Sequence, residues 1–501
     1  MRKVKFFMSM IFILAALVAC NSEEDGPVSG ENGGDEGESR DKITWYMSDS
    51  SQAIPAESPM EIPTIQYLAD KTNTDLDIQF LPHSDYISQL RLKFASEEFP
   101  DVYQNWGITE FDSEFIFENE QALPLNDLLK EHGQNLLEKI PDFAWDAVTI
   151  RGDIWAIPRP AYGNAPAERM MFVRGDWLKE LDLDIPETSD QFLDMLRAFK
   201  TRGDDIIPFS MREDITWGSN LFGMWGLNWW DGYSLYEGEV IPDAIHPRMK
   251  KPLEFLNTMY EEGLLDHEFL TNASSEYSQK IRADRVGVWV HNTNLAWGWQ
   301  ENLNNDSNEE NPEAIVIPTP RGDGYDGPLG RIEQPVGRTY FIHKDAENPE
   351  AIIRLFDWLV TDEGQVFSEL GIEGDTYEIV DGEYVYDKEK DKDQQSSFRS
   401  QLLRIHPYNE ELTRVKEGEE AEEKLTTAYE LAREEGIPNI TIGIPPAPSL
   451  YDLRGLFVET AAKIIVGDAP IDTFDDFVET WINNGGEEVI SHMTEWYERL
   501  N

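Results

Sequence analysis

Segments with strand-like and helix-like apolar patterns alternate over the first folded part of this chain. Strand-like patterns are ITWYMS at 43–48, LDIQFLP at 76–82 and PDVYQNW at 100–106, with helix-like patterns between them at 63–73 and 86–95. Strands that alternate with helices across short loops are typical of a mainly parallel sheet covered by helices. The sequence therefore predicts an α/β fold that begins at Lys42.

The rest of the chain continues this alternation and becomes richer in helix. VTIRGDIWAIPRP at 148–160 predicts a β-hairpin that turns at Gly152-Asp153, and Thr188 or Ser189 is a candidate helix cap. Helices are expected at 175–183, 189–201, 250–262 and 349–361, strands at 285–291, 314–322 and 338–344, an acidic exposed hairpin and loop at 375–393, and C-terminal helices broken at Gly485-Gly486. A chain of 501 residues has room for two or more domains.

The first 20 residues have the organisation of an export signal. Arg2, Lys3 and Lys5 precede an apolar run at 6–19, which is shorter than the ~20 residues of a membrane-spanning helix. The run ends in Leu-Val-Ala-Cys, which resembles the lipobox of bacterial lipoproteins and contains Cys20, the single cysteine of the sequence. The resemblance implies that Cys20 is lipidated and tethers the chain to the extracytoplasmic face of a cell membrane, as on a Gram-positive cell surface. An ordinary signal peptide with an incidental cysteine is the alternative.

Residues 21–41 are too polar to build a core. They contain eight acidic residues, five glycines and a single aliphatic residue, Val28. A segment of this composition is expected to be a disordered acidic tether between lipid and folded body.

The net charge limits the possible partners. It is −55, from 42 basic and 97 acidic residues, and loss of the three basic residues of the leader would make it −58. Nucleic acid is not an expected partner, because phosphate binding requires a basic face. Self-repulsion of this size is screened at high salt, so a saline or alkaline habitat is suspected.

Five sequence stretches together resemble the family 1 extracellular solute-binding proteins of bacterial ABC importers, in the branch of long LipO-like lipoproteins. They are ASEEFPDVY at 95–103, GDIWAIP at 152–158, FVRGDWLKEL at 172–181 followed by IPETSDQFLDMLRAFK at 185–200, PEAIIRLFDWLVTDEGQ at 349–365 running into LGIEGDTYE at 370–378, and the C-terminal stretch at 467–500. The resemblance covers almost all of the chain that follows the leader.

The resemblance implies a two-lobed periplasmic-binding-protein-like fold with a hinge and a central ligand cleft. The N-terminal lobe is expected at 42–158 plus 314–345, and the helix-richer C-terminal lobe at 159–313 plus 346–501. The implied function is capture of an oligosaccharide and its delivery to separate ABC transporter permease subunits by a protein that is itself monomeric. A binder of peptides or of another small polar solute is the alternative within this class.

No metal ion or other cofactor is expected. Many relatives carry a calcium-like loop after the second of the paired helices, but here this stretch is only TRGDD at 201–205. It lacks the alternating oxygen ligands and the final bidentate Glu of a calcium loop. The stretch DKEKDKD at 387–393 has no turn glycine and is interpreted as a solvated loop.

Aromatic residues gather in two stretches that are candidates for the ligand site. Indole rings offer flat apolar surfaces to sugar rings, and neighbouring polar side chains can reach the hydroxyl groups. Burial in the core is the competing explanation for each of them. The candidates are Trp217, Trp225, Trp229 and Trp230 in the first stretch, Trp289, Asn292, Trp297 and Trp299 in the second, and Trp45, Asp49, Trp106, Tyr162, Arg212 and Glu373 elsewhere.

A surface polysaccharide-degrading enzyme is the alternative from another class, because aromatic and acidic residues also build glycosidase sites. With 97 carboxylates in the chain, however, no pair of them is informative. The sequence contains no G-x-S-x-G, no G-x-x-x-x-G-K-[ST] and no zincin motif. We therefore expect a binding protein rather than an enzyme.

The net charge bears on the kind of sugar. Long-range repulsion by a strongly negative chain disfavours uronic-acid oligomers and so favours neutral glycans. High salt would remove this effect, and Arg159, Arg212 and Arg338 would reverse it locally if they lie in the cleft.

Overall fold

Residues 40–501 form one compact unit built around two separate β-sheets. This computed structural model describes residues 40–50, 54, 56, 58–108, 112, 115, 116, 119–215, 217–229, 231–393, 396–445, 447 and 453–500. The proposed signal peptide, Cys20 and almost all of the proposed tether lie outside these residues.

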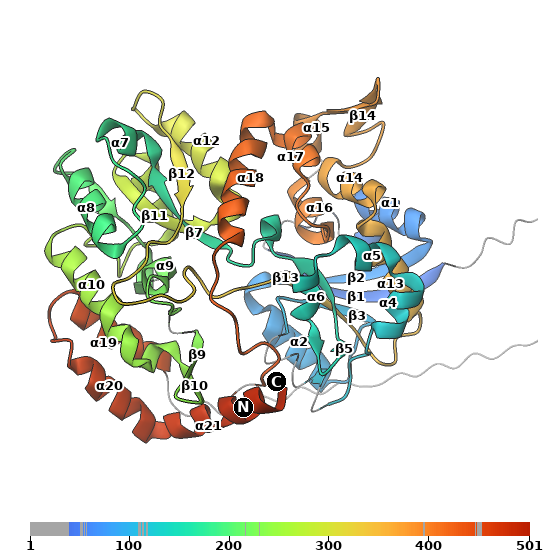
Figure 1. Cartoon of the computed structure of the whole chain (residues 1–501). Coiled ribbons are helices and arrows are strands. Elements are labelled where there is room, and N and C mark those ends of the chain that lie inside the picture. Colours follow the sequence, from blue (N-terminus) through green and yellow to red (C-terminus); the bar gives the residue numbers. More distant parts are fainter. Residues whose placement is uncertain are drawn as a thin grey trace, which may run out of the picture. The chain divides into compact units, whose positions relative to one another are not determined.

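The first sheet has five strands in the order β2-β1-β3-β13-β6. Strand β1 pairs in parallel with β2 and β3, as the alternating pattern predicts, and Figure 1 shows these three strands side by side. Strand β13 is antiparallel to both β3 and β6, so the sheet is mixed rather than mainly parallel. The strands are β1 (Asp41–Ser48), β2 (Thr74–Leu81), β3 (Val102–Asn105), β6 (Ile157–Pro160) and β13 (Val336–Ile342).

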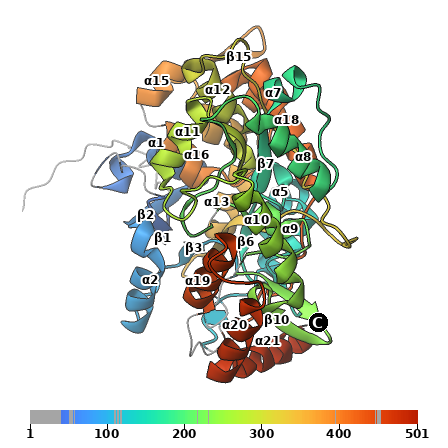
Figure 2. The ribbon, with the colours of Figure 1, turned by 90° about the vertical axis from the view of Figure 1, so that its left-hand side faces the viewer.

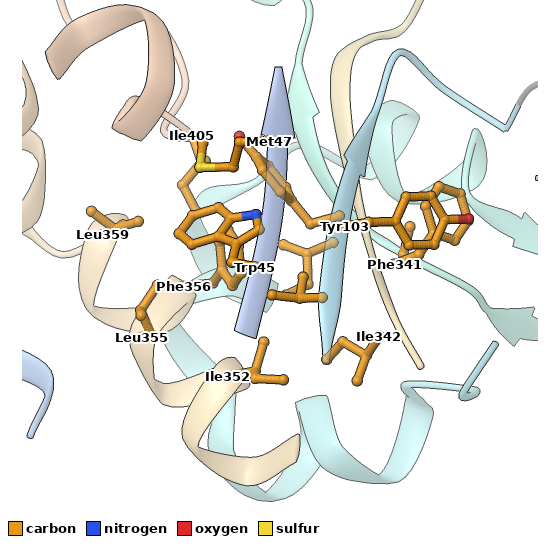
Figure 3. Close-up of a cluster of buried hydrophobic side chains, with 14 of the residues drawn as sticks. Trp45, Met47, Tyr103, Phe341, Ile342, Ile352, Leu355, Phe356, Leu359 and Ile405 are labelled. Atoms are coloured by element: carbon orange, nitrogen blue, oxygen red, sulfur yellow. The ribbon is translucent and has the colours of Figure 1, made fainter. Parts of the chain in front are cut away.

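Helices from two distant parts of the sequence share the core of this sheet. Trp45 on β1 packs edge-on against Phe356 of α13, at 5.3 Å between ring centroids, and Figure 3 shows both within one apolar cluster. We call this sheet and its helices the first lobe. The helices are α1 (Pro63–Thr72), α2 (Tyr86–Ala95), α4 (Asn126–His132), α5 (Gln134–Lys139), α6 (Asp142–Asp146), α13 (Pro349–Leu359), α14 (Asp362–Leu370) and α16 (Ser396–Leu403), with short turns η1 (Pro59–Glu61) and η2 (His83–Asp85).

Two small hairpins and two short helices complete this lobe. The predicted hairpin at 148–160 is much shorter, because only β4 (Thr149–Ile150) and β5 (Asp153–Ile154) pair across a turn at Arg151 and Gly152. The acidic segment at 375–393 contains the expected hairpin of β14 (Tyr377–Val380) and β15 (Glu383–Tyr386), but its end is helix α15 (Lys388–Asp393). The expected loop at 387–393 is therefore mostly a helix; residues 387–390 are exposed as expected, but Asp391 is fully buried against Arg399. Helix α17 (Glu410–Glu417) packs on α14.

The second sheet has four strands in the order β12-β7-β11-β8, and its two faces are both covered. On β7, Met171 and Val173 belong to one apolar cluster, and Met170 and Phe172 belong to another on the opposite face. This alternation follows from the two-residue period of a strand. The strands are β7 (Arg169–Arg174), β8 (Ile207–Phe209), β11 (Val286–Asn292) and β12 (Ala314–Ile317).

The second lobe consists of this sheet with its covering helices, including those at the C-terminal end. Figure 2 shows α19, α20 and α21 together, beside α10 and β10. The elements are α7 (Gly175–Glu180), α8 (Ser189–Lys200), α9 (Ser219–Gly223), α10 (Lys250–Glu261), α11 (Ser274–Arg282), α12 (Ala296–Asp306), α18 (Glu419–Arg433), α19 (Leu453–Ile465), α20 (Thr473–Trp481), α21 (Glu487–Leu500), the hairpin β9 (Tyr233–Tyr236) and β10 (Glu239–Pro242), and the turns η4 (Tyr162–Asn164), η5 (Glu213–Ile215), η6 (Asp243–Ile245), η7 (Pro247–Met249), η8 (Thr293–Leu295) and η9 (Ile482–Gly486).

The chain passes between the lobes at three places, and two expected boundaries need correction. Residues 314–317 form β12 of the second sheet, although we assigned them to the first lobe. Residues 349–403 pack in the core of the first lobe, although we assigned them to the second, because α13 buries its apolar face against β1. The crossings are therefore at about 161–168, at about 318–335 and between α17 and α18, at Gly418.

Helix α8 offers a direct test of local sequence signals. The Thr188 hydroxyl accepts a hydrogen bond from the Gln191 backbone N–H, and the Gln191 side-chain oxygen accepts one from the Thr188 backbone N–H. This capping box satisfies donors that a helix start otherwise leaves unpaired. Thr188→Ala is expected to lower the free energy of unfolding by about 1 kcal/mol, measured by urea denaturation. Thr188→Ser keeps the hydroxyl and should retain most of the stability, and an equal loss in both variants would contradict this explanation.

Candidate functional site: a cleft between the lobes

A cavity of about 650 Å³ lies between the two lobes, at their crossing segments. Trp106, Gly107 and Ile108 reach it from the end of β3, and Arg159 reaches it from β6. Val336, Gly337 and Arg338 reach it from β13 of the first lobe. The second lobe and the crossing segments contribute Tyr162, Glu168, Asp231, Tyr233, Asn292, Gln334, Pro335, Asn439, Thr441, Ile442, Ile444, Pro445 and Met493. A ligand in this cavity would contact both lobes at once.

Trp106 supplies the largest aromatic surface on the first-lobe side. It is half-buried, and its indole packs edge-on against His83 at 5.4 Å and Tyr86 at 5.2 Å between centroids. These edge contacts fix the ring while it lines the cavity. The position follows from topology, because residues that come after a parallel strand lie at the sheet edge where ligands bind in open α/β folds.

A second cavity of about 370 Å³ lies beside the first, and both are lined by Asp231. Trp217 lines it and stacks on His291, at 4.2 Å between centroids, with the guanidinium of Arg169 4.3 Å from its ring. Trp217 has φ 61°, and so has the β-branched residue Ile215. Positive φ at such residues costs free energy and is concentrated at functional sites.

Buried amide oxygens without a partner point to a polar ligand. Among the described residues, Asn292 Oδ1 in the first cavity and Asn228 Oδ1 in the second are buried and accept no hydrogen bond. Buried polar atoms are nearly always paired, so an exception needs an explanation. Hydroxyl groups of a ligand would supply the missing donors.

Arginine is the commonest charged residue of both cavities. Arg159 and Arg338 line the first, and Arg169, Arg212, Arg331 and Arg454 line the second. Burial lowers the pKa of Arg169 to about 9 and that of Arg338 to about 10, and each is lowered further by a neighbouring arginine. Burial likewise lowers the pKa of Arg331. The carboxylates of the two linings are Glu168, Asp231 and Glu213, and Glu213 forms an ion pair with Arg212 at 2.7 Å.

The structure brings six of the predicted site residues to these cavities. Trp106, Tyr162 and Asn292 line the first, and Arg212, Trp217 and Trp229 line the second. The Tyr162 ring has the guanidinium groups of Arg159 and Arg404 5.1 and 4.7 Å from its centroid. Contact of these six residues with ligand stays a prediction.

Other predicted aromatic residues lie in the core instead. Trp45, Trp225, Trp289 and Trp299 are at most 4% exposed, and Trp297 packs half-buried on the same cluster as Trp289. Trp45 lies inside β1, within the strand that the sequence predicts at 43–48, and its side chain points into the core. Trp225 and Trp299 pack under crossing loops and helices, and neither lines the cavity between the lobes.

The remaining candidates also lie away from the two cavities or outside the described residues. Asp49 follows β1 and accepts a hydrogen bond from the His83 backbone at 2.9 Å, and Glu373 is exposed in a turn beside Tyr377. Neither residue lines either cavity. Trp230 and Cys20 lie outside the described residues.

The sequence reasoning missed most of the polar lining. Arg169, Arg331, Glu168 and Gln334 were not singled out, because they are isolated polar residues outside the tryptophan-rich stretches. Asp231 was also passed over, although it directly follows Trp230 in the first of these stretches. They come together since 161–168 and 318–335 both cross between the lobes, and Gln334 N donates to Pro166 O at 2.8 Å. Gly337 also matters, since a Cβ there would lie 2.7 Å from Arg159 Nη2.

Residues 56–366 match the bacterial extracellular solute-binding protein family. This match covers more than half of the chain, so the protein is a member of that family. The fold with two sheets and a lined cleft between them is in accord with this membership.

Relatives and solved structures of this class cover nearly the whole chain. Lipoprotein LipO of Bacillus subtilis (strain 168) is 23% identical over 89% of this chain and 91% of its own length. The polygalacturonan/rhamnogalacturonan-binding protein YtcQ of the same organism is 22% identical over 99% of both chains. The HMO-binding, ABC-transporter-associated solute-binding protein of Bifidobacterium longum infantis aligns with a TM-score of 0.68 at 16% identity, over 92% of this chain and 99% of its own. These relatives are named as lipoprotein or binding proteins, and the structural likeness shows the fold.

The described residues contain neither a candidate membrane span nor a candidate metal-binding cluster. No helix in this part of the chain is long and apolar enough to cross a membrane. No group of three or more His, Cys, Asp or Glu side chains within the described ranges is arranged to hold a metal ion.

Proposed function

We propose that this protein is a lipid-anchored extracellular substrate-binding protein that captures an oligosaccharide and delivers it to ABC transporter permease subunits. The observation that carries the proposal is the cleft between the lobes, where indole and phenol rings lie beside unpartnered amide oxygens. Sites for sugars combine flat apolar surfaces with a few placed polar groups. Membership of the solute-binding family and the sugar ligands in the names of YtcQ and other relatives support it.

Ligand capture would work through closure of the cleft. The three crossings between the lobes are the places where a hinge motion can occur. A ligand that contacts Trp106 in one lobe and Asn292 in the other binds the closed form more tightly and so stabilises it. The closed form is then the state that docks on the permease, while lipid on Cys20 holds the protein at the membrane.

The test is a binding screen with the full chain in detergent micelles. Intrinsic tryptophan fluorescence and thermal melting are followed across panels of oligosaccharides, peptides and small polar solutes. A ligand of the native state raises stability by about 2.7 kcal/mol at a concentration of 100 times its Kd, so the Tm should rise with oligosaccharide concentration. A response to peptides but to no oligosaccharide would support a solute-binding function and contradict the assignment of an oligosaccharide as the ligand. Release of new reducing ends from a polysaccharide would instead indicate a glycosidase.

A further inference from the structure

The charge of the cleft is opposite to the charge of the chain. The chain carries −55 overall, yet the described lining of the two cavities holds six arginines and three carboxylates. Surplus cations at this one place cannot come from a generally basic surface. The surplus of arginines is a property of the ligand site and bears on the charge of the ligand.

Four of these arginines form no ion pair with the described residues, although Glu168 and Asp231 of the same linings attract three of them at longer range. Among the described residues, Arg159, Arg169, Arg331 and Arg338 form no ion pair. Arg159 is only 3% exposed, and its Nε and Nη1 donate to no atom; Nε of Arg169 and of Arg338 are also buried without an acceptor. Arg331 donates to the neutral side chain of Gln334 at 3.1 Å.

Buried arginines elsewhere in the same protein are paired. Arg174 donates to Asp176 and Asp284 at 2.6 and 2.8 Å, and Arg399 binds Asp391 through two nitrogens at 2.7 Å. This is the usual arrangement, because an uncompensated buried charge is strongly destabilising. The four cleft arginines lack the ion pairs that Arg174 and Arg399 form.

Two of these arginines lie over half-buried indole rings that line the cavities. The guanidinium of Arg338 is 5.2 Å from the centroid of the Trp106 ring, and that of Arg169 is 4.3 Å from the centroid of the Trp217 ring. Each pair places a cationic fork beside an apolar ring at the cavity wall. A guanidinium binds a planar carboxylate through two parallel hydrogen bonds. A pyranose ring that carries a carboxylate fits such a pair.

We propose that the oligosaccharide is acidic, with uronic-acid carboxylates bound by Arg159, Arg169, Arg331 and Arg338. The proposal rests on the function proposed above and specifies its ligand. It also reverses our expectation of a neutral sugar, which considered the net charge of the whole chain. Charges on the outer surface are screened within about 8 Å at physiological salt, whereas the cleft arginines are buried and close to the ligand.

The first experiment compares each acidic sugar with its own uncharged form. Oligogalacturonates and oligoglucuronates of three to five rings are titrated into the full chain by calorimetry, next to their methyl esters, which keep the rings and linkages but lose the charge. We expect the free acid to bind at least about tenfold more tightly than its ester. Equal or tighter binding of the esters, or of neutral oligosaccharides only, would overturn the acidic ligand and leave the oligosaccharide function standing. No binding of any glycan would overturn the function itself.

The second experiment separates a ligand-binding arginine from a structural one. Arg159→Met removes a buried cation that forms no ion pair within the described ranges, so the ligand-free Tm should stay equal or rise, while affinity for the uronate falls by about 30-fold or more. Affinity for the methyl ester should change far less. Arg338→Met is the parallel variant, and Arg354→Gln, at an exposed ion pair with Asp41, is the control with unchanged binding. Full uronate affinity in both methionine variants would contradict the proposal.

Discussion

Trp289→Ala is expected to lower the free energy of unfolding by about 3–5 kcal/mol, whereas Trp106→Ala should mainly weaken ligand binding. Trp289 is fully buried on β11, where it stacks on Phe172 at 5.7 Å and meets Trp299 edge-on at the same distance. Its removal leaves a large cavity that packed neighbours can fill only in part. The measurement is urea denaturation followed by far-ultraviolet circular dichroism.

Trp106 differs because part of its ring faces the cleft. The variant Trp106→Ala should lose only about 1–2 kcal/mol of stability, through its edge contacts with His83 and Tyr86. Affinity for the oligosaccharide should fall by about 10- to 100-fold, as for an aromatic residue central to an interface. Calorimetry measures this without relying on the fluorescence of the residue that is removed. Trp106→Phe keeps a ring and should recover part of the affinity.

The two variants together decide where the ligand site is. If Trp106→Ala binds normally while Trp289→Ala remains folded but no longer binds, the cleft between the lobes is not the site. The same outcome would indicate a ligand site near the aromatic cluster of α12 and β11. Normal ligand binding in both variants would show that these aromatic residues do not take part in ligand recognition.

The elements of the first lobe were predictable because their patterns are local. The short apolar run of β1, the two-residue period of β2 and the helical period of α1 and α2 are visible in a few residues each. Parallel pairing follows from the alternation of strands and helices. The capping box at Thr188 is equally local. The lobe to which each helix belongs could not be predicted from such local patterns. Helix α13 lies more than 300 positions after β1, and the packing of its Phe356 on Trp45 assigns it to the first lobe.

The sequence predicted which types of residue line the site better than it predicted the individual residues. Tryptophan-rich stretches indicated aromatic lining, but a single strand places alternate side chains on opposite sides. On β11, Trp289 is in the core, while Asn292 at the strand end reaches the cleft. Trp45 was a candidate although it lies inside the predicted strand, and in β1 its side chain faces the core. Burial of an indole depends on what packs over it, and sequence does not show this.

The arginines were harder to find because no spacing connects them. Arg159 and Arg338 are paired positions of β6 and β13, while Arg169 begins β7 and Arg331 lies in a crossing segment. Three elements and one crossing bring them to one cleft. The overall charge pointed to the opposite conclusion, since 97 carboxylates spread over the chain conceal a local surplus of cations. Ligand charge therefore has to be inferred from the cleft and not from the composition.

Mild acid is expected to destabilise this protein through buried histidines. Burial lowers the pKa of His246 and of His406 to about 4, and burial with the charges of Arg169 and Arg212 lowers that of His291 to about 4 as well. At His406, Glu369 lies 3.6 Å away and acts in the opposite direction, but burial and Arg404 outweigh it. All three are neutral in the folded protein at neutral pH.

The sign of the effect follows from proton uptake. In the unfolded chain a histidine has a pKa of about 6.5, so between about pH 6.5 and pH 4 the unfolded state binds more protons than the folded state. Stability contributed by these groups is therefore present above about pH 6.5 and is lost as the pH falls toward 4. Each histidine should cost about 2 kcal/mol between about pH 7 and pH 5, a range in which most carboxylates remain charged.

The variant His406→Gln tests this assignment through the slope of stability against pH. The amide can replace the contacts of the ring nitrogens with Ser368 Oγ and Pro407 O, and it takes up no proton. We expect the loss of unfolding free energy between about pH 7 and pH 5 to shrink by about 2 kcal/mol relative to the unmodified chain, whatever the variant's stability at pH 7. His246→Gln should shrink it by a similar amount, and the two effects should add, because the histidines lie in different lobes. Equal slopes in His406→Gln and the unmodified chain would show that His406 accepts its proton in the folded protein and that acid lability arises elsewhere.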